Sequence, residues 1–274
     1  MQVRELTSPS NALVKVFRRA LSDGVTREGW LAAEGPRLVN EALNASGHTP
    51  DCSTATIHSV LVSRSGAEKF NSILERMPRD AEIAQVPDRL FQQAAQTQTP
   101  QGIAALVELP HPNWEKTLAC RDRLLLIACG LQDPGNLGTI MRSAEALGAT
   151  ALVTLPATVS PFNPKAVRSC GGALFRLPVF PGEDPDPLFK RLRGAGVRIV
   201  AADRASALAL AQADLRGPLA ILVGNEASGL APDVAAQASL RLSIPIRPKA
   251  DSVNAAMAAA IFLYEAARQR EFRY

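Results

Sequence analysis

The sequence predicts an α/β protein of two domains, a smaller one over residues 1–110 and a larger one over residues 122–274 with a mainly parallel sheet. The first observation behind this prediction is that short apolar runs alternate with stretches of helical periodicity along the chain. The second is a length of 274 residues, which exceeds the usual size of one domain. The third is a composition with 47% hydrophobic and 20% charged residues, which is typical of globular proteins.

The first domain is predicted to be a small α/β unit. Its opening helix, residues 8–21, follows the start signal SPSN. The apolar stripe of that helix consists of Leu13, Val16, Phe17, Ala20 and Leu21. Strands are expected at residues 30–34, 56–63, 82–86 and 102–109. Further helices are expected at residues 36–45, with Pro36 in the first turn, and at residues 66–77.

The segment LPHPNWEKTLACRD, residues 109–122, has two prolines and no clean period, so the domain boundary is placed there, with residues 111–121 as the linker. Strands are then expected at residues 124–131, 151–155, 176–180, 197–203, 219–226 and 240–246. A strand followed by a helix, repeated, implies a mainly parallel sheet covered on both faces. Ligands of such sheets bind at the carboxyl ends of the strands.

A long final helix is expected from about residue 252 to residue 270. Ser252 or Asp251 is expected to cap it, and Asn254 is a polar residue near its start. The predicted buried stripe consists of Val253, Ala256, Met257, Ala260, Ile261 and Tyr264.

Charge is divided unevenly between the two halves of the chain. Residues 1–110 hold 11 Lys and Arg against 12 Asp and Glu, a balance of −1, whereas residues 111–274 hold 19 against 14, a balance of +5. The second half therefore favours an anionic partner. The first 22 residues also carry four cations, Arg4, Lys15, Arg18 and Arg19, against Glu5 alone. They predict either a local basic face or an ordinary solvated helix face.

Several classes of protein are disfavoured by the sequence. The longest apolar run has ten residues, 255–264, whereas about 18 are needed to cross a bilayer. The N-terminal residues lack the apolar core of a signal peptide. The four cysteines, Cys52, Cys120, Cys129 and Cys170, show no metal-ligand spacing. We therefore expect reduced thiols, no metal and a cytoplasmic protein without a membrane partner.

The stretch QDPGNLGTIMRSAEALGA, residues 132–149, follows an apolar strand and resembles neither a Walker loop nor a dinucleotide fingerprint. Asn136 is well placed to cap a helix whose free amides face an anion. Arg142 follows six residues later, so both side chains can lean toward the same end of that helix. The alternative is that Asn136 is only a cap and Arg142 a surface cation, and local reasoning does not choose between the two.

Two further strand ends carry polar residues. VGNEASGL, residues 223–230, leaves Asn225 and Glu226 at the tip of a strand, where a carboxylate could hold a ribose hydroxyl or orient an arginine, although a simple turn explains the same letters. IPIRPKADSVNAAMAAAIFLYE, residues 244–265, places Arg247 and Lys249 just before the final helix.

In this order and with these spacings, the three motifs identify a resemblance. The second domain resembles the SpoU (TrmH-type) family of RNA 2′-O-ribose methyltransferases, which belongs to the SPOUT class. The first motif is carried by Asn136, Gly138 and Arg142, the second by GNEASGL, and the third by IPI followed by SVNAAMAAAIFLYE. The resemblance covers residues 122–270, and the N-terminal region is similar to the ribosomal-protein-like RNA-binding domain of many such enzymes.

The resemblance implies a fold, a cofactor and an assembly. It implies a deep trefoil knot, which no argument from periodicity would give because knots are rare. It implies S-adenosylmethionine bound within the knotted loops, mostly by backbone groups, and a homodimer with the alanine-rich last helix as a candidate contact surface. The implied cofactor-binding residues are Val223, Gly224, Asn225, Glu226, Ile244, Ile246, Val253, Asn254 and Ala255.

The resemblance also implies residue roles. The implied catalytic residues are Arg142, Asn136, Glu226, Asn254 and Ser252, and RNA-binding roles fall to Arg142, Arg247, Lys249, Arg18 and Arg19. Because arginine is a poor base, we favour Arg142 gripping the RNA phosphate and polarising the 2′-hydroxyl over literal proton abstraction. Asn136 would shape the acceptor site, whereas Glu226 and Asn254 would fix the loops and Arg142.

The third motif departs from the commonest family pattern, because RPKAD precedes Ser252 and SVNAA replaces SLNVS. This leaves the RNA substrate open: ribosomal RNA is favoured by the N-terminal domain, and transfer RNA is the alternative. A Rossmann-type methyltransferase or dehydrogenase is disfavoured because the glycine-rich turn and the acidic residue that it needs are absent. An inactive RNA-binding relative is the remaining rival.

Overall fold

The computed structural model describes residues 3–46, 55–247 and 252–273. The chain divides into two compact units. Unit 1 comprises Met1–His111 and Phe162–Arg176, and unit 2 comprises Pro112–Pro161 and Leu177–Tyr274. A short piece of the second half of the sequence is thus part of the N-terminal unit.

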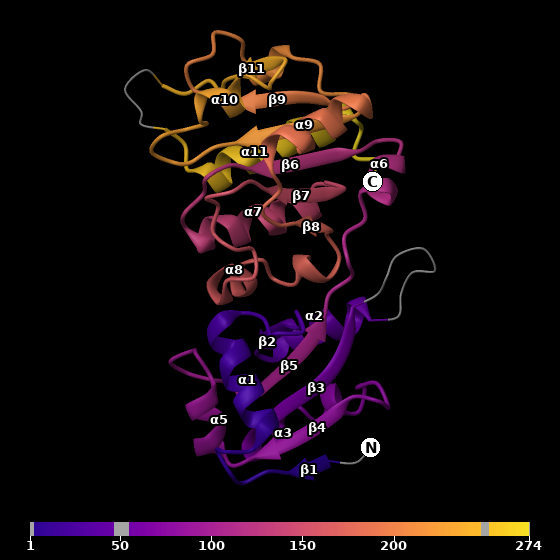
Figure 1. The fold of residues 1–274 in the computed structure, drawn as a ribbon, viewed down its shortest axis with the longest axis vertical. Helices are drawn as coiled ribbons and strands as arrows, with labels where there is room; N and C mark the ends of the chain where they lie inside the picture. Colours follow the sequence, from indigo (N-terminus) through magenta and orange to yellow (C-terminus); the bar gives the residue numbers. More distant parts are fainter. Residues whose placement is uncertain (1–2, 47–54, 248–251, 274) are drawn as a thin grey trace. The chain divides into compact units, whose positions relative to one another are not determined.

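Unit 1 is built on a mixed five-stranded sheet in the order β1-β4-β3-β5-β2 (Figure 1). The strands are β1 (Val3–Glu5), β2 (Leu31–Glu34), β3 (Thr56–Ser63), β4 (Glu82–Val86) and β5 (Ile103–Glu108). Strands β1, β4 and β3 are parallel, whereas β5 pairs antiparallel with both β3 and β2. This agrees with the predicted small α/β domain, although β1 was not predicted.

Short helices accompany this sheet. They are α1 (Ala12–Asp23), α2 (Pro36–Ala45), α3 (Arg64–Lys69), α4 (Asn71–Leu74), α5 (Asp88–Ala94), α8 (Pro164–Ser169) and the 3-10 helix η1 (Ala173–Phe175). Helix α1 starts four residues later than predicted, because Asn11 caps it by accepting a hydrogen bond from the Leu13 amide. The helix predicted at residues 66–77 is two helices that meet at Phe70, and α5 was not predicted.

The segment 162–176 is tied to unit 1 by close packing and by one ion pair. Gly24 has a φ of +93°, and a Cβ atom there would lie 1.8 Å from the carbonyl oxygen of Phe162. Arg176 donates to the Glu41 carboxylate at 2.7 Å. Only glycine satisfies both the backbone conformation and the spacing at position 24.

Unit 2 is built on a six-stranded sheet in the order β11-β9-β10-β6-β7-β8, and every pair in it is parallel. The strands are β6 (Leu124–Ala128), β7 (Ala151–Thr154), β8 (Val179–Phe180), β9 (Arg198–Ala202), β10 (Leu219–Val223) and β11 (Leu240–Leu242). The predicted parallel sheet is confirmed. Strands β6, β7 and β10 are buried along their whole length, as expected for strands covered on both faces.

The helices of unit 2 are α6 (Trp114–Ala119), α7 (Pro134–Ala146), α9 (Pro185–Gly194), α10 (Pro232–Ala235) and α11 (Ala255–Gln269), with the 3-10 helix η2 (Leu210–Gln212). Helices α7 and α11 pack against each other and touch β7 and β10 respectively (Figure 1). Apolar residues of α9 and α10 join a core with alternate residues of β6, β7, β9 and β10. Helix α6 lies in the segment for which the sequence indicated no regular period.

The predicted buried stripe of α11 is mostly wrong: Ala256 is buried and Val253 and Ala260 are half-buried, whereas the three other members are exposed. Met257 is 58% exposed, Ile261 is 37% exposed and Tyr264 is 51% exposed. The buried face of α11 consists instead of Ala255, Ala256, Ala259, Phe262, Leu263, Ala266 and Ala267. Five alanines on this face let α11 lie close to its neighbours, and Phe262 and Leu263 supply its large buried side chains.

Among the described residues, no helix combines the length and apolar character needed to cross a membrane.

Candidate active site

One asparagine joins the three motif loops of unit 2. The Asn136 side chain on α7 donates from Nδ2 to Oε1 of Glu226 at 2.5 Å. Its Oδ1 accepts a hydrogen bond from Nδ2 of Asn254 at 3.1 Å. Glu226 follows β10 and Asn254 precedes α11. These two residues are 90 and 118 positions away from Asn136 in the sequence, and both bond to its side chain. Three of the predicted catalytic residues therefore form one hydrogen-bonded cluster, which we call the amide cluster.

The caps of the two helices at this cluster differ from the expected ones. Asp133, not Asn136, caps α7 by accepting from the amides of Gly135 and Asn136 at 2.5 and 3.4 Å. Asn254 caps α11 by accepting from the amides of Ala256 and Met257, so the expectation for Ser252 is wrong, and Asp251 lies outside the described residues. With Asp133 in the capping role, the Asn136 side chain is available to the cluster.

The loop after β10 holds its shape through its own backbone. Asn225 and Gly229 exchange two backbone hydrogen bonds at 3.0 and 2.9 Å, and a Cβ on Gly224 would lie 2.4 Å from the Gly229 carbonyl carbon. The Asn225 side chain accepts from the amides of Ala227 and Ser228 and donates to the Gly130 carbonyl at 3.0 Å. The loop is therefore rigid and anchored to the loop after β6 before any ligand arrives.

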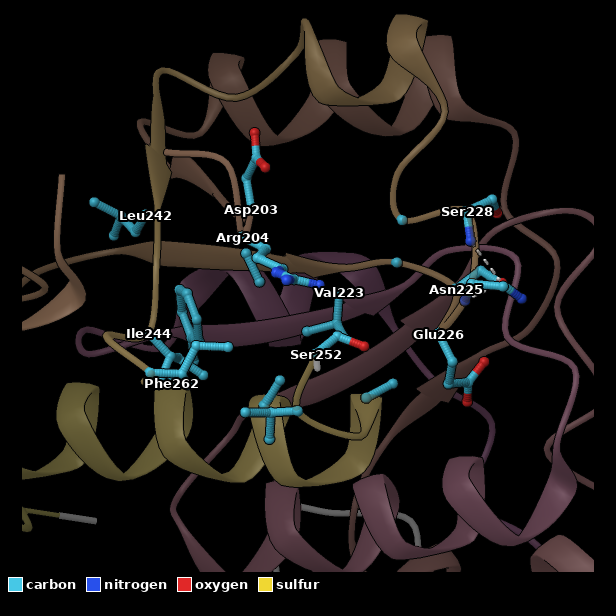
Figure 2. Close-up of a pocket in the computed structure, with 18 residues that line it drawn as sticks. Asp203, Arg204, Val223, Asn225, Glu226, Ser228, Leu242, Ile244, Ser252 and Phe262 are labelled. Carbon is cyan, nitrogen blue, oxygen red and sulfur yellow. Dashed lines mark hydrogen bonds between the residues drawn. The ribbon is translucent and has the colours of Figure 1, made fainter. Parts of the chain in front are cut away.

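A cavity of about 290 Å³ opens beside this loop, between the carboxyl ends of β9 and β10 and the start of α11 (Figure 2). Of the predicted cofactor-binding residues, the cavity is lined by Val223, Gly224, Asn225, Glu226, Ile244, Ile246, Val253 and Ala255. Ser252 lines it as well. Asn254 lies outside this lining and bonds Asn136 instead. The cavity sits where ligands of open parallel sheets bind.

The lining suits a nucleoside-type cofactor such as S-adenosylmethionine. Its volume is close to the lower limit for small-molecule sites, which begins at about 300 Å³. Apolar side chains, including Val223, Ile244 and Phe262, can contact a flat base or a thioether chain. The small residues Gly224 and Ala255 leave backbone groups accessible for hydrogen bonds. The residues present therefore fit the expected cofactor.

Several lining residues were not identified from the sequence, among them Ala202, Asp203, Arg204 and Leu242. Three of them lie at or just after the carboxyl end of β9, which pairs with β10. Sheet order was the missing information, because a neighbouring parallel strand ends at the same edge of the sheet. Phe262, from the second turn of α11, also lines the cavity and was not identified.

The predicted RNA-binding cations are exposed wherever the structure describes them. Arg142 lies on the exposed face of α7, on the same side as Thr139. Arg247 is exposed in the segment that follows β11. Arg18 and Arg19 are exposed on α1, and Arg19 pairs with Asp23 at 3.3 Å. Lys249 lies outside the described residues. The Glu226 carboxylate accepts a hydrogen bond from the Asn136 side chain, which links the loop after β10 to α7.

Cysteine chemistry does not contribute to this site. Cys129 is buried at the end of β6, and burial raises the pKa of its thiol to about 12. Burial also raises the pKa of the Cys170 thiol, whereas Cys120 is exposed, and all three are free thiols. Cys52 lies outside the described residues. Within the described ranges, no group of three or more His, Cys, Asp or Glu residues is arranged to hold a metal ion.

Two family models match the chain, one over each half. The model of the SpoU rRNA methylase family matches residues 123–264. The model of an MRM3-like substrate binding domain matches residues 26–105.

Characterised relatives resemble the chain over most of its length. The 23S rRNA (guanosine(2553)-2′-O)-methyltransferase RlmP of Bacillus subtilis is 30% identical over 267 residues, which cover 96% of this chain and 98% of the relative. The 23S rRNA (uridine(2479)-2′-O)-methyltransferase of Streptomyces viridochromogenes is 35% identical over 207 residues, 74% of this chain and 72% of the relative. The structure of an AdoMet-bound rRNA methyltransferase from Sinorhizobium meliloti superposes with a TM-score of 0.82 at 28% identity, covering 98% of both chains.

Proposed function

This chain belongs to the SpoU rRNA methylase family, and from that membership we propose that it methylates a ribose 2′-hydroxyl of 23S ribosomal RNA. The reaction class is that of the family: the chain is an S-adenosylmethionine-dependent RNA ribose-2′-O-methyltransferase. The two characterised relatives modify a guanosine and a uridine respectively. Family membership therefore supports ribosomal RNA and leaves the nucleotide to experiment.

The observation that carries the proposal is the amide cluster beside the cofactor-sized cavity. Asn136, Glu226 and Asn254 come from three separate motifs and bond each other at 2.5 and 3.1 Å. Asn136 and Glu226 are half-buried and Asn254 is exposed, so the cluster holds three separate loops together at a site that solvent and a ligand can reach. The cluster supports an intact catalytic site and argues against the inactive binding-protein alternative.

When bound, S-adenosylmethionine supplies a methyl group on a sulfonium sulfur, which a hydroxyl oxygen can attack. We propose that the loops after β10 and β11 position this methyl group and that the amide cluster fixes the loops. Asn136 holds Glu226 and Asn254 together, so the cavity and the start of α11 keep one geometry. Such positioning accounts for a large share of the rate enhancement in a displacement between two bound partners.

We propose that Arg142 binds the RNA phosphate next to the reactive ribose and polarises the 2′-hydroxyl. Arg142 is exposed on α7, the helix that carries Asn136, so its guanidinium can reach a bound polymer. Arginine presents five donors and no acceptor, which suits a phosphate and makes it a poor proton acceptor. Proton abstraction by Arg142 is therefore the weaker alternative.

We further propose that the enzyme is a homodimer that contacts its partner through α11. Met257, Ile261 and Tyr264 are spaced four and three residues apart and are 58%, 37% and 51% exposed. Exposed large apolar side chains that form a continuous stripe mark a protein interface. We propose as well that the C-terminal segment forms the trefoil knot of the family. We also propose that the enzyme works in the cytoplasm, where ribosomal RNA is available.

The test is methyl transfer from labelled S-adenosylmethionine to unmodified 23S rRNA or tRNA transcripts, with digestion to nucleosides and mass spectrometry. We expect a 2′-O-methylnucleoside from 23S rRNA. Arg142→Ala should lower the rate by about 10²- to 10⁴-fold, the range for a side chain that acts on the reacting hydroxyl. Arg193→Ala is the matched control, because Arg193 is exposed on α9 and bonds Gln237 away from the cavity.

Three outcomes would contradict parts of this proposal. Methylation of tRNA alone would retain the chemistry and replace the substrate. A methylated base would overturn the ribose assignment. If Arg142→Lys is fully active, the planar fork of donors that we assign to the phosphate contact is not needed.

A further inference from the structure

The loop between β6 and α7, residues 129–133, carries the chain from the sheet to the helix that holds Asn136 and Arg142. It turns at Gly130, which has a φ of +69° and no atom within 4 Å of the place that a Cβ would take. Glycine has more backbone freedom than any other residue. The path of the chain into α7 therefore depends on the hydrogen bonds that hold Gly130.

The amide of Gly130 is held by Thr158, which lies in the loop after β7. The Thr158 hydroxyl accepts a hydrogen bond from the Gly130 amide at 2.9 Å and donates one to the Ala128 carbonyl at 3.1 Å. A single hydroxyl thus joins the last residue of β6 to the glycine two residues later. The Val159 amide also donates to the Leu131 carbonyl at 2.8 Å, so the two loops are bonded side by side.

The loop after β7 adopts a strained backbone next to Thr158. Ala157 has a φ of +62°, which is unfavourable for a residue with a Cβ. Its carbonyl accepts a hydrogen bond from Nε2 of Gln132 at 2.5 Å, and the same Nε2 donates to the Gly130 carbonyl at 3.3 Å. Strained backbone persists where the surrounding structure imposes it, and such residues cluster at functional sites. We therefore looked for a functional group at the other end of these contacts.

The carbonyl of Gly130 connects the loop to the cofactor cavity. Asn225, which lines the cavity (Figure 2), donates from Nδ2 to the Gly130 carbonyl at 3.0 Å. Asn225 also precedes Glu226, a member of the amide cluster. Gly130 is thus fixed by Thr158 on its amide and by Asn225 on its carbonyl. Because the loop after β10 is rigid through its own backbone bonds, loss of the Thr158 contact would displace the loop between β6 and α7.

Resting on the proposed function, we infer that Thr158 is a positioning residue for methyl transfer. Its hydroxyl fixes the loop that leads into α7, so that Asn136 and Arg142 keep their place relative to the bound cofactor. Thr158 does not line the cavity, so it acts on the acceptor side of the reaction through Gly130. A displacement of about 1 Å can lower a rate by about 100-fold, so a small shift of α7 is enough to slow the reaction.

The test uses Thr158→Val, which keeps the branched shape of the side chain and removes the hydroxyl. Methyl transfer from labelled S-adenosylmethionine to 23S rRNA should show a kcat about 10-fold lower than that of the wild-type protein. The KM for S-adenosylmethionine and the affinity for S-adenosylhomocysteine, measured by isothermal titration calorimetry, should stay unchanged. Thr158→Ser keeps the hydroxyl and should restore kcat.

Thr154→Val is the matched control, because Thr154 makes the same kind of bond away from the site. It ends β7, and its hydroxyl accepts from the Gly182 amide at 2.9 Å, as the Thr158 hydroxyl does from Gly130. Thr154 is 2% exposed, so its substitution should lower the thermal midpoint at least as much as Thr158→Val does. Its kcat, assayed well below the midpoint, should equal that of the wild-type protein.

Four outcomes would overturn the inference. Equal losses of kcat in Thr154→Val and Thr158→Val would mean that Thr158 acts through stability alone. An unchanged kcat in Thr158→Val would show that the bond to Gly130 does not position α7. If Thr158→Val loses affinity for S-adenosylhomocysteine as much as it loses kcat, Thr158 shapes the cofactor cavity. These three outcomes leave the proposed function intact, whereas a wild-type protein that transfers no methyl group to RNA would contradict both.

Discussion

Helices α1 and α11 begin in the same way and present opposite chemistry to solvent. Each is capped by an asparagine, Asn11 for α1 and Asn254 for α11, whose side-chain oxygen accepts amide hydrogen bonds. Helix α1 buries Val14, Phe17, Ala20 and Leu21 and exposes mainly charged side chains, whereas α11 buries an alanine-rich face and exposes Met257, Ile261 and Tyr264.

The contrast shows what each exposed face requires. Charged side chains such as those of Lys15 and Arg18 on α1 are well solvated in water, so their exposure is no sign of a binding partner. A role for them in binding RNA therefore needs evidence from RNA binding itself. Three large apolar side chains in one stripe are unfavourable in water, so the exposed face of α11 supports the proposed contact with a second subunit. The two asparagine caps differ too, because only Asn254 also donates to another side chain, that of Asn136.

The largest effect is expected from a charge placed on the exposed stripe of α11. Ile261→Glu would put a carboxylate into the proposed dimer contact, where an unpaired charge is strongly unfavourable. We expect a monomer by light scattering and a loss of methyl transfer of about 100-fold or more, given the several kcal/mol that an unpaired buried charge costs.

The control for this variant is Val16→Glu on α1, because Val16 and Ile261 are both 37% exposed. Val16→Glu should leave the assembly state unchanged. If Ile261→Glu remains a dimer with normal activity, the stripe is not the interface, and the exposed face of α11 has another role.

The second prediction separates the two tasks of Asn254. Asn254→Asp keeps a side-chain oxygen for the cap but replaces the Nδ2 donor with a second acceptor facing Oδ1 of Asn136. We expect the thermal midpoint to stay near that of the wild type, while turnover falls by about 10-fold, since a lost polar contact costs about 1–3 kcal/mol. Asn254→Ala should lower turnover and also lose about 1 kcal/mol of stability.

Asn11→Ala is the matched control, since Asn11 caps α1 by accepting from the Leu13 amide. It should reduce stability to a similar extent and leave turnover unchanged. Equal turnover in Asn254→Asp and the wild type would show that the bond to Asn136 does not position the site.

Local patterns predicted those parts of the fold that a short stretch of chain decides. Strand β3 coincides with the predicted residues 56–63, and helix α2 with residues 36–45, because each combines a clear period with a clear start signal. Periodicity failed for α11, since its sequence is apolar on almost every side and several stripes fit equally well. Packing against α7 and β10 chose the alanine face, which is information from the tertiary structure.

The same distinction applies to the site. The family resemblance implied roles for Asn136, Glu226 and Asn254, and the structure brings these three side chains together. Asp203 and Arg204 were missed because nothing in their own stretch is unusual. They reach the cavity only because β9 is paired beside β10, and sheet order cannot be read from a single stretch of sequence.

The smallest effect concerns the cations of α1 and compares two neighbouring arginines. Arg19 pairs with Asp23 at 3.3 Å one turn later, with both side chains exposed, whereas no described acid is paired with Arg18. A phosphate contact by Arg18 would therefore release a counterion without breaking an ion pair. Arg18→Ala should weaken binding of a 23S rRNA fragment and reduce the slope of log affinity against log salt by about 0.7–0.9.

Arg19→Ala should change both the affinity and the salt slope less, and Asp23→Asn should raise the affinity by releasing Arg19. Equal salt slopes for wild-type protein and both arginine variants would mean that α1 presents a solvated face that RNA does not touch.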